Sequence, residues 1–302
     1  MKFDYDVLIV GGGPAGLQSA QMLGRAGRTA LVCDDGRPRN RPAAHMHYFP
    51  TRDGLPPEEF RRLFRSDLAH YPSLHLRDVS VTDLVPKEEG FEGVLADGSR
   101  VSARKIILAD GVQDILPPIP GLSELFGKTV FHCPYCHGYE FKGKTLGIVG
   151  NGEMAFAMTG ILRGLSQDLI LFTQGASAFS SEQAEALARR GVPIIEETIA
   201  SFLGEEDGVL IRLDNGREIF RHGILLRPPQ KPKSDLGLRL GCRINEQGFY
   251  EVDTEAQSSV ANVFIAGDGM DPRQSVLTSA YTGMMAAISA NHRLAREDML
   301  RD

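Results

Sequence analysis

Two glycine-rich turns, each placed between an apolar run and a helical stretch, constrain the fold of this chain more than any other feature. The first turn, Gly11 to Gly16, follows the apolar run Tyr5 to Val10 and precedes a helical stretch that ends near Ala26. The second turn, Gly150 to Ala155, follows the apolar run Thr145 to Val149 and also leads into a helical stretch. Further apolar runs follow each helix, at 29–33 and 169–173. The sequence therefore predicts two β-α-β units.

The first turn has the spacing of a nucleotide-binding turn. Gly11 permits the tight turn, Gly13 lets the backbone approach a pyrophosphate, and Gly16 allows close packing of helix on strand. Asp34 stands at the end of the second strand, where a carboxylate can accept hydrogen bonds from a ribose. A glycine turn alone can be purely structural, but strand, helix, second strand and acid are all present in order. The residues assigned to this dinucleotide site are Gly11, Gly13, Pro14, Ala15, Gly16, Asp34 and Asp35.

A second candidate nucleotide motif lies near the end of the chain, in Val263 to Gly269. It resembles the second FAD motif of the flavoproteins with two dinucleotide-binding domains. By that resemblance Asp268, beside Gly267, hydrogen-bonds the ribitol chain of FAD, and the helix that follows, at about 274–290, directs its N-terminus at the flavin. A capped strand end before a core helix is the structural alternative. Ile106 to Gly111 occupies the place of the family's Ala-Thr-Gly strand, with Gly111 assigned to the turn and Asp110 a departure.

The cysteines divide into two kinds. Cys33 and Cys242 lie in apolar surroundings and are expected to be inert packing residues. Cys133 and Cys136 form a Cys-x-x-Cys pair, whose spacing lets two thiols close a small disulfide ring and exchange two electrons. His137, directly after the pair, can lower the thiol pKa or carry the proton. We therefore interpret Cys133, Cys136 and His137 as catalytic.

Other interpretations of the cysteine pair are weaker. Cys-x-x-Cys-His also fits c-type haem attachment, which requires export to an oxidising compartment, whereas the chain shows no leader. Zinc binding would use His132, Cys133, Cys136 and His137, but no second ligand pair completes a tetrahedral site, so no metal is expected. Glutaredoxins share the Cys-Pro-Tyr-Cys sequence, yet here it follows a flavin-type domain. Flavin-coupled thiol exchange is favoured.

The chain length and charge set the broader expectations. The 302 residues are natural for two α/β domains, and the proline-rich segment 116–121 is interpreted as a linker. We predict a discontinuous FAD domain at 1–115 and 244–302, with an inserted NAD(P)-type domain carrying the cysteine pair at 116–243. The net charge of −6 does not indicate a positively charged surface for binding nucleic acid. No uninterrupted apolar run is long enough to span a bilayer. A soluble, cytoplasmic protein without a membrane or nucleic-acid partner is expected.

Taken over nearly its whole length, the chain resembles the low-molecular-weight thioredoxin reductases. The resemblance implies that Cys136 faces the flavin and Cys133 meets the substrate, and that Arg273 and Gln274 lie against the flavin ring. His137 occupies the place of the family's acidic proton donor. The family recognises NADPH with arginines after the second strand of the inserted domain, but here 172–175 reads Phe-Thr-Gln-Gly. Since Thr173 is no carboxylate either, a structural relic is favoured over a working NAD(P)H site.

Within this family, the chain is most similar to the FAD-dependent dithiol oxidases of gliotoxin and holomycin biosynthesis. They share Cys-x-x-Cys-His-Gly-Tyr/Trp-Glu, and their Arg-Asn loop and a histidine, here Arg39, Asn40 and His45, approach the FAD. A solvated basic loop is the alternative for residues 37–41. The resemblance implies oxidation of a small dithiol, with electrons passing through the cysteines and flavin to oxygen. It also implies a homodimer, and Tyr135, Phe49 and residues 45–47 are the candidates for lining the substrate pocket.

Three further functions remain open from the sequence. One is an NAD(P)H-dependent reductase of a disulfide or of a thioredoxin-like protein, which runs the same cysteines in the opposite direction. Another is a reductase supplied with electrons by ferredoxin or another protein donor. The third is a non-catalytic flavin redox sensor. Reduction of the flavin by nicotinamides, by dithiols or by neither separates these possibilities.

Overall fold

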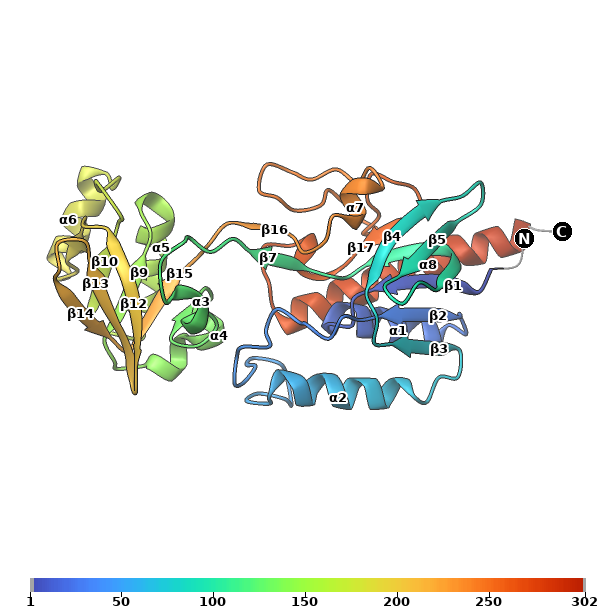
Figure 1. Ribbon diagram of the computed structural model, residues 1–302, viewed down its shortest axis with the longest axis horizontal. Helices are drawn as coiled ribbons and strands as arrows, with labels where there is room; N and C mark the ends of the chain where they lie inside the picture. Colours follow the sequence, from blue (N-terminus) through green and yellow to red (C-terminus); the bar gives the residue numbers. More distant parts are fainter. Residues whose placement is uncertain (1–2, 301–302) are drawn as a thin grey trace. The chain divides into compact units, whose positions relative to one another are not determined.

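The computed structural model describes residues 3–300 and divides into two compact units (Figure 1). Unit 1 consists of three chain segments. The first ends at Arg41, the second runs from Tyr48 to Asp114, and the third begins at Gln230. Unit 2 consists of Pro42–His47 and Ile115–Pro229. The long segment of unit 2 is thus inserted into unit 1, and a short earlier loop belongs with it.

The point of return to unit 1 differs from the sequence prediction. The prediction places the return at 243/244, but the structure assigns 230–243 to unit 1. In this segment β16 (Gln230–Pro232) pairs antiparallel with β7 (Val112–Asp114), and Leu236 and Cys242 are buried in a core of unit 1. The polar stretch after Gly241 is therefore a surface part of unit 1, because the apolar residues before it already anchor the chain there.

Unit 1 is built on a seven-stranded sheet with a parallel half and an antiparallel half. Its order is β3-β2-β1-β6-β5-β4, and β17 also pairs with β6. The strands are β1 (Tyr5–Val10), β2 (Ala30–Cys33), β3 (Leu74–Arg77), β4 (Val81–Pro86), β5 (Phe91–Leu95), β6 (Arg100–Leu108) and β17 (Val263–Ile265). The last residues of β6 pair with β17. Strands from distant parts of the chain thus end at the same edge, as the two predicted nucleotide motifs require.

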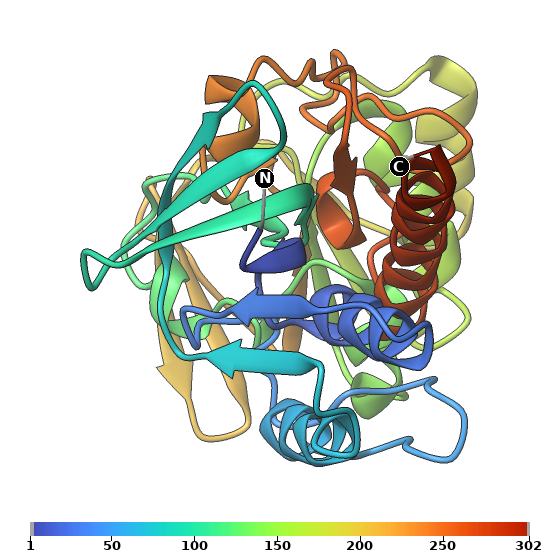
Figure 2. The ribbon, with the colours of Figure 1, turned by 90° about the vertical axis from the view of Figure 1, so that its right-hand side faces the viewer.

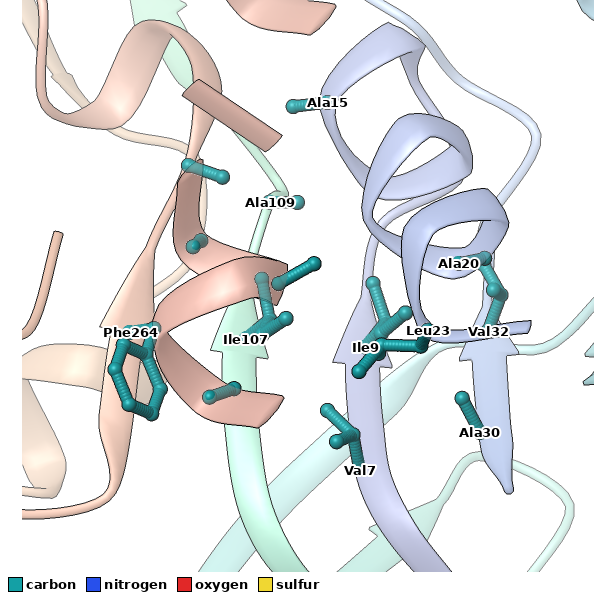
Figure 3. Close-up of a cluster of buried hydrophobic side chains, with 14 of the residues drawn as sticks. Val7, Ile9, Ala15, Ala20, Leu23, Ala30, Val32, Ile107, Ala109 and Phe264 are labelled. Carbon is teal, nitrogen blue, oxygen red and sulfur yellow. The ribbon is translucent and has the colours of Figure 1, made fainter. Parts of the chain in front are cut away.

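Helices α1 (Pro14–Arg25) and α8 (Val276–Leu300) pack together on one face of this sheet (Figure 2). Figure 3 shows the core between them and the strands, with Ile9 beside Leu23 and with Ile107 between Ile9 and Phe264. A second core fills the other face. The remaining helical elements of unit 1 are α2 (Pro57–Leu68), α7 (Leu236–Arg239) and the 3-10 turn η2 (Gly267–Gly269). The final helix is longer than the 274–290 predicted, because its apolar face continues to Leu294.

Unit 2 repeats the same plan with a five-stranded parallel sheet in the order β11-β10-β9-β15-β8. Its strands are β8 (Val130–Phe131), β9 (Leu146–Val149), β10 (Leu169–Phe172), β11 (Ile194–Ile195) and β15 (Gly223–Leu226). Every residue of β10 is buried, as expected for a parallel strand covered on both faces. An antiparallel sheet of β12 (Ile199–Glu205), β13 (Gly208–Leu213) and β14 (Glu218–Arg221) packs in the same unit.

The helical elements of unit 2 include those that follow the second glycine turn and that contain the cysteine pair. α5 (Gly152–Leu162) follows the second glycine turn, and α6 (Ser181–Arg189) begins with a capping box of Ser180 and Gln183. The shorter elements are α3 (Leu122–Leu125), α4 (Pro134–His137) and the 3-10 turn η1 (Gly138–Phe141). The prediction of two Rossmann-like domains, one discontinuous and one inserted with the cysteine pair, is confirmed. No helix within residues 3–300 is both long and apolar enough to cross a bilayer.

Candidate active site

The first glycine turn leaves open space at the start of α1. A Cβ on Gly11, whose φ is +103°, would lie 2.5 Å from the Ala109 carbonyl oxygen, and one on Gly16 would lie 1.9 Å from the Gly11 oxygen. Gly13 has no atom within 4 Å of its Cβ position. No side chain caps this helix N-terminus, so its first N–H groups face the open space. Pro14 and Ala15 begin the helix. The turn therefore fits the pyrophosphate of a dinucleotide.

Asp34 follows β2 beside this turn, and it has partners that the sequence did not reveal. Its carboxylate is buried, accepts a hydrogen bond from the Gly36 N–H at 3.1 Å and pairs with Arg61 of α2. Arg65 lies 3.7 Å away, and Arg61 also donates to the Gly12 carbonyl at 3.3 Å. Helix α2 thus neutralises the carboxylate that was assigned to the ribose. Nothing in the local sequence around Asp34 signals these arginines, because they belong to a helix much further along the chain.

Asp35 is held by a lysine from the last segment of unit 1. Lys233 approaches the Asp35 carboxylate to 2.9 Å and also donates to the Arg37 carbonyl at 3.0 Å. Burial alone would raise the pKa of Asp35, but the hydrogen bonds from Lys233 and from the Arg37 N–H outweigh it and lower the pKa. Asp35 is therefore ionised at neutral pH and fixes the loop after β2.

The second predicted motif meets the first at the same sheet edge. Gly267 has a φ of +77°, and a Cβ there would lie 3.1 Å from the Cβ of Ala15. The Asp268 carboxylate accepts from the Ser279 hydroxyl at 3.0 Å and from Arg39 at 3.2 Å. Burial raises the pKa of Asp268, while Arg39 and Ser279 oppose the shift. A half-buried acid next to an open glycine turn fits the sugar part of a flavin nucleotide.

Arg39, in the loop after the first motif, joins Asp268 of the second motif to Asp114 and Gln274 in one network. Its Nε and Nη2 each donate to the Asp114 carboxylate at 2.7 Å, while Nη1 reaches Asp268 and Gln274. The structure therefore brings together Arg39, Asp268 and Gln274, which the sequence assigned separately. Asp114 was not predicted, because an acid so distant from Arg39 along the chain carries no local signal.

Three other predicted cofactor residues lie outside this network. Arg273 is 85% exposed and pairs with Asp271 in its own turn. Asn40 is half-buried in the loop after Arg39. His45 is exposed in the short segment of unit 2, with its ring 6.4 Å from that of His47. Their roles toward a cofactor stay predictions.

Gly111 turns the chain after β6 with a φ of +78°, and its carbonyl accepts from the Lys233 N–H at 3.0 Å. The preceding Asp110, which the sequence treated as a minor departure, is a half-buried acid that accepts from the Ser234 hydroxyl at 2.5 Å. Burial raises the pKa of Asp110, and the hydrogen bonds from Ser234 only partly oppose this shift. Asp110 lies against Gly11, so the threonine position of the family's Ala-Thr-Gly strand is here filled by an acid whose pKa burial raises.

Cys133 and Cys136 form a disulfide in unit 2, with their Cα atoms 5.3 Å apart. Cys133 is the N-cap of α4, and its Sγ accepts from the Cys136 N–H at 3.2 Å. Buried Pro134 starts the helical turn, whereas Tyr135 is 68% exposed. The N–H donated to Cys133 Sγ favours a thiolate at Cys133 when the disulfide is open.

His137 ends this turn and has an unusual environment. Its ring stacks on Phe131 with centroids 5.9 Å apart, and neither buried ring nitrogen has a hydrogen-bond partner among residues 3–300. Burial lowers the pKa of His137, and the charge of Glu140 opposes the shift only in part. His47 pairs with Glu140 at 3.3 Å and also works toward the lower pKa. The imidazole is therefore neutral at pH 7 and able to accept a proton.

The other two cysteines, Cys33 and Cys242, are packing residues in an apolar core of unit 1, as predicted. Both are free and buried, and burial raises the pKa of Cys33 to about 12. Burial also raises the pKa of Cys242, whose thiol donates to the Ser258 hydroxyl at 3.3 Å. These thiols stay protonated. Across the described part of the chain, no group of three or more His, Cys, Asp or Glu is placed to hold a metal ion.

The second glycine turn differs from the first in one respect. The Asn151 side chain accepts from the Gly152 N–H at 2.9 Å and from the Ala178 N–H at 2.7 Å, so α5 is capped by its own turn. Beside it is a cavity of about 210 Å³, lined by Gly150, Met154, Arg227 and apolar strand residues. The Thr173 hydroxyl donates to the Gly175 carbonyl at 2.7 Å. The group at the ribose position is thus engaged with its own backbone.

Two Rossmann-like units, a flavin-type pair of motifs and a Cys-x-x-Cys disulfide define a flavoprotein disulfide oxidoreductase. The family model for pyridine nucleotide-disulphide oxidoreductases matches residues 5–290, and the chain belongs to this family. It is an FAD-dependent enzyme, and the first glycine turn and Asp268 fit that cofactor.

Named relatives support the same placement. The chain is 33% identical to thioredoxin reductase tcpT of Claviceps purpurea, over 96% of this chain and 94% of the relative. An oxidoreductase structure from Agrobacterium tumefaciens matches with a TM-score of 0.91 at 34% identity, covering 98% of this chain and 99% of the other. The structure of HlmI matches with the same TM-score and identity, covering 98% and 94%. The predicted resemblance is confirmed.

Proposed function

We propose that this protein oxidises a dithiol to a disulfide through Cys133 and Cys136, with FAD as the internal acceptor and oxygen as the final one. The observation that carries the proposal is the contrast between the glycine turns. The turn before α1 is open and uncapped, whereas Asn151 caps α5 and the Thr173 hydroxyl is already hydrogen-bonded. The segment 172–175 contains neither the arginines that recognise an NADPH phosphate in this family nor a carboxylate for an NAD ribose, which favours an electron source other than a nicotinamide.

The chemistry begins with the substrate and ends with a restored disulfide. A substrate thiolate attacks Cys133 Sγ, the Cys133–Cys136 bond breaks, and a mixed disulfide forms. The second substrate thiolate then attacks the substrate sulfur of that bond, which releases the oxidised substrate and leaves both cysteines reduced. FAD, when bound, would supply a two-electron acceptor for reoxidation of the Cys133–Cys136 pair, with oxygen as the final acceptor. The sum is one dithiol and one oxygen giving one disulfide and one hydrogen peroxide.

His137 is the proposed acceptor for the thiol protons. Its neutral imidazole follows the cysteine pair directly, and its lowered pKa keeps it neutral at pH 7. The proton can leave His137 by way of Glu140 and His47, which pair with each other at 3.3 Å. In unit 1 we assign Gly11, Gly13, Asp268 and Arg39 to the FAD, with Gln274 beside Arg39.

A second function is favoured by the relatives' names and by the cavity beside Gly150. Relatives such as tcpT are named thioredoxin reductases, and Arg227 lines the cavity with one cationic group. An NAD(P)H-dependent reductase would use the same cysteines in the reverse direction. Its partner would be a disulfide or a thioredoxin-like protein.

Anaerobic stopped-flow spectroscopy separates the two functions. The yellow protein is mixed with dithiothreitol, NADPH or NADH while the visible flavin band is followed. We expect rapid bleaching with the dithiol, recovery of the band on admission of air, and little change with either nicotinamide. Rapid bleaching by NADPH or NADH would refute the oxidase and establish the reductase. Cys136→Ser is the matched control, in which the dithiol should no longer bleach the flavin.

A further inference from the structure

Asp114 and Gln230 lie where the two chain crossings leave unit 1. Asp114 ends β7 and Gln230 begins β16, and the two residues are direct partners in this antiparallel ribbon. The next residues outward, Ile115 and Pro229, belong to unit 2. Asp114 and Gln230 are therefore the last residues of unit 1 at the two crossings.

Both residues also belong to the Arg39 network. Asp114 accepts from Arg39 Nε and Nη2 at 2.7 Å each, and from the Gln230 amide at 2.9 Å. Gln230 and Gln274 exchange two amide hydrogen bonds, of 3.1 Å and 2.6 Å. Two of the residues assigned to the flavin site are thus each bonded to a residue of the ribbon, Arg39 to Asp114 and Gln274 to Gln230.

The geometry of the arginine fork explains what Asp114 does. A guanidinium is planar, so a bidentate bond through Nε and Nη2 fixes the direction of the remaining nitrogen, Nη1. That nitrogen reaches Asp268, at 3.2 Å, and Gln274. Arg39 and Asp114 are only 18% and 10% exposed, so their pairing is little weakened by solvent. Without Asp114, the guanidinium would be held through Nη1, by Asp268 and Gln274, and its plane would no longer be fixed.

We propose that Asp114 and Gln230 are positioning residues for the flavin site, which hold Arg39 and Gln274 in place and thereby join FAD binding to the ribbon that carries the inserted unit. The inference rests on the assignment of Arg39, Asp268 and Gln274 to the FAD. Neither ribbon residue is required to touch the cofactor. Asp114 acts through Arg39, and Gln230 acts through Gln274.

A double-mutant cycle on the holoenzyme tests this role. Asp114→Asn, Arg39→Gln and the double variant are diluted, and release of FAD is followed by the rise in flavin fluorescence. We expect Asp114→Asn to weaken FAD binding about tenfold, the scale of one charge-assisted hydrogen bond. In the Arg39→Gln background the same change should have less than a twofold effect. Asp97→Asn, which removes a carboxylate from the exposed pair with Arg77, is the matched control and should stay within twofold of wild type.

The outcomes are distinct. Equal weakening in both backgrounds, unchanged binding, or tighter binding by Asp114→Asn would overturn the positioning role. If Asp114→Asn does not fold, the cycle of Gln230→Ala with Gln274→Ala decides, with about threefold weakening expected only while Gln274 is present. A wild-type protein that binds FAD but is not reduced by dithiols would refute the proposed reaction, and the cycle would still decide the role of Asp114.

Discussion

The imidazole of His137 lies against the ring of Phe131, with the ring centroids 5.9 Å apart and the planes inclined by 20°. Because both ring nitrogens are buried without a hydrogen-bond partner in residues 3–300, the charged form of His137 is disfavoured. The ring is thus a base that remains unprotonated to a lower pH than a solvent-exposed histidine. In a thiol exchange enzyme this keeps a proton acceptor beside the cysteine pair.

As the pH is lowered, the rate of flavin reduction by dithiol should therefore begin to fall only below about pH 6.5, the ordinary pKa of histidine. The sign follows from the lowered pKa: the imidazole becomes protonated, and unable to accept, only after the pH falls past that lowered value. His137→Gln should slow the step about 100-fold and remove this acid limb. The measurement is the stopped-flow rate from pH 5 to 8. His292→Gln, at an exposed position of α8, should change nothing, and an unaltered profile in His137→Gln would contradict the role.

The two cysteines should differ in their reactions when each is left alone. In Cys136→Ser the remaining Cys133 is the thiol assigned to the substrate, and it should react with Ellman's reagent at least ten times faster than Cys136 does in Cys133→Ser. Both variants should retain FAD, since neither cysteine belongs to unit 1. Both should lose dithiol oxidation, since each lacks one sulfur of the disulfide. Cys242→Ser is the control and should leave dithiol oxidation unchanged, because burial raises the pKa of that thiol and keeps it protonated. The reverse order of reactivity would exchange the two roles.

The sequence revealed those parts of the site that are encoded by local spacing. The Gly11–Gly16 turn and the Cys133–Cys136 pair each consist of characteristic residue types at short, fixed spacing, so the sequence pattern was sufficient to predict them. Asp114, Arg61 and Lys233 were missed because each reaches its partner from a distant part of the chain. Charged residues of this kind look like ordinary surface residues until the fold places an acid or a base beside them.

The strands of the fold were predictable because they too are encoded by local patterns, whereas the boundaries between the two units were not. Buried strands such as Leu169–Phe172 are read directly from continuous apolar runs. The crossing at 229/230 depends instead on the pairing of Gln230–Pro232 with Val112–Asp114, a strand from a much earlier part of the chain. The assignment of Pro42–His47 to unit 2 depends on tertiary contacts of the same kind, including the pair of His47 and Glu140.

Gly13 provides a test of the nucleotide site that does not involve the cysteines. A Cβ at this position meets no protein atom within 4 Å, so Gly13→Ala should fold with wild-type thermal stability in the absence of FAD. The added methyl group would instead enter the space assigned to the pyrophosphate and weaken FAD binding by tenfold or more. Fluorescence of released flavin measures this. Gly160→Ala, in α5 and also without neighbours within 4 Å, should leave FAD binding unchanged.

The carboxylate of Glu297 should be one of the larger contributors to the stability of unit 1. It pairs with Lys105, whose side chain is only 2% exposed, and with Arg104 at 3.0 Å. Glu297→Gln would leave the Lys105 ammonium buried with Asn262 as its remaining partner at 2.8 Å, so we expect a loss of about 2–4 kcal/mol in the free energy of unfolding. Glu255→Gln, which breaks the more exposed pair with Arg293, should cost less than about 1 kcal/mol. Urea denaturation of both variants measures the difference, and equal costs would show that burial of Lys105 does not strengthen its pair.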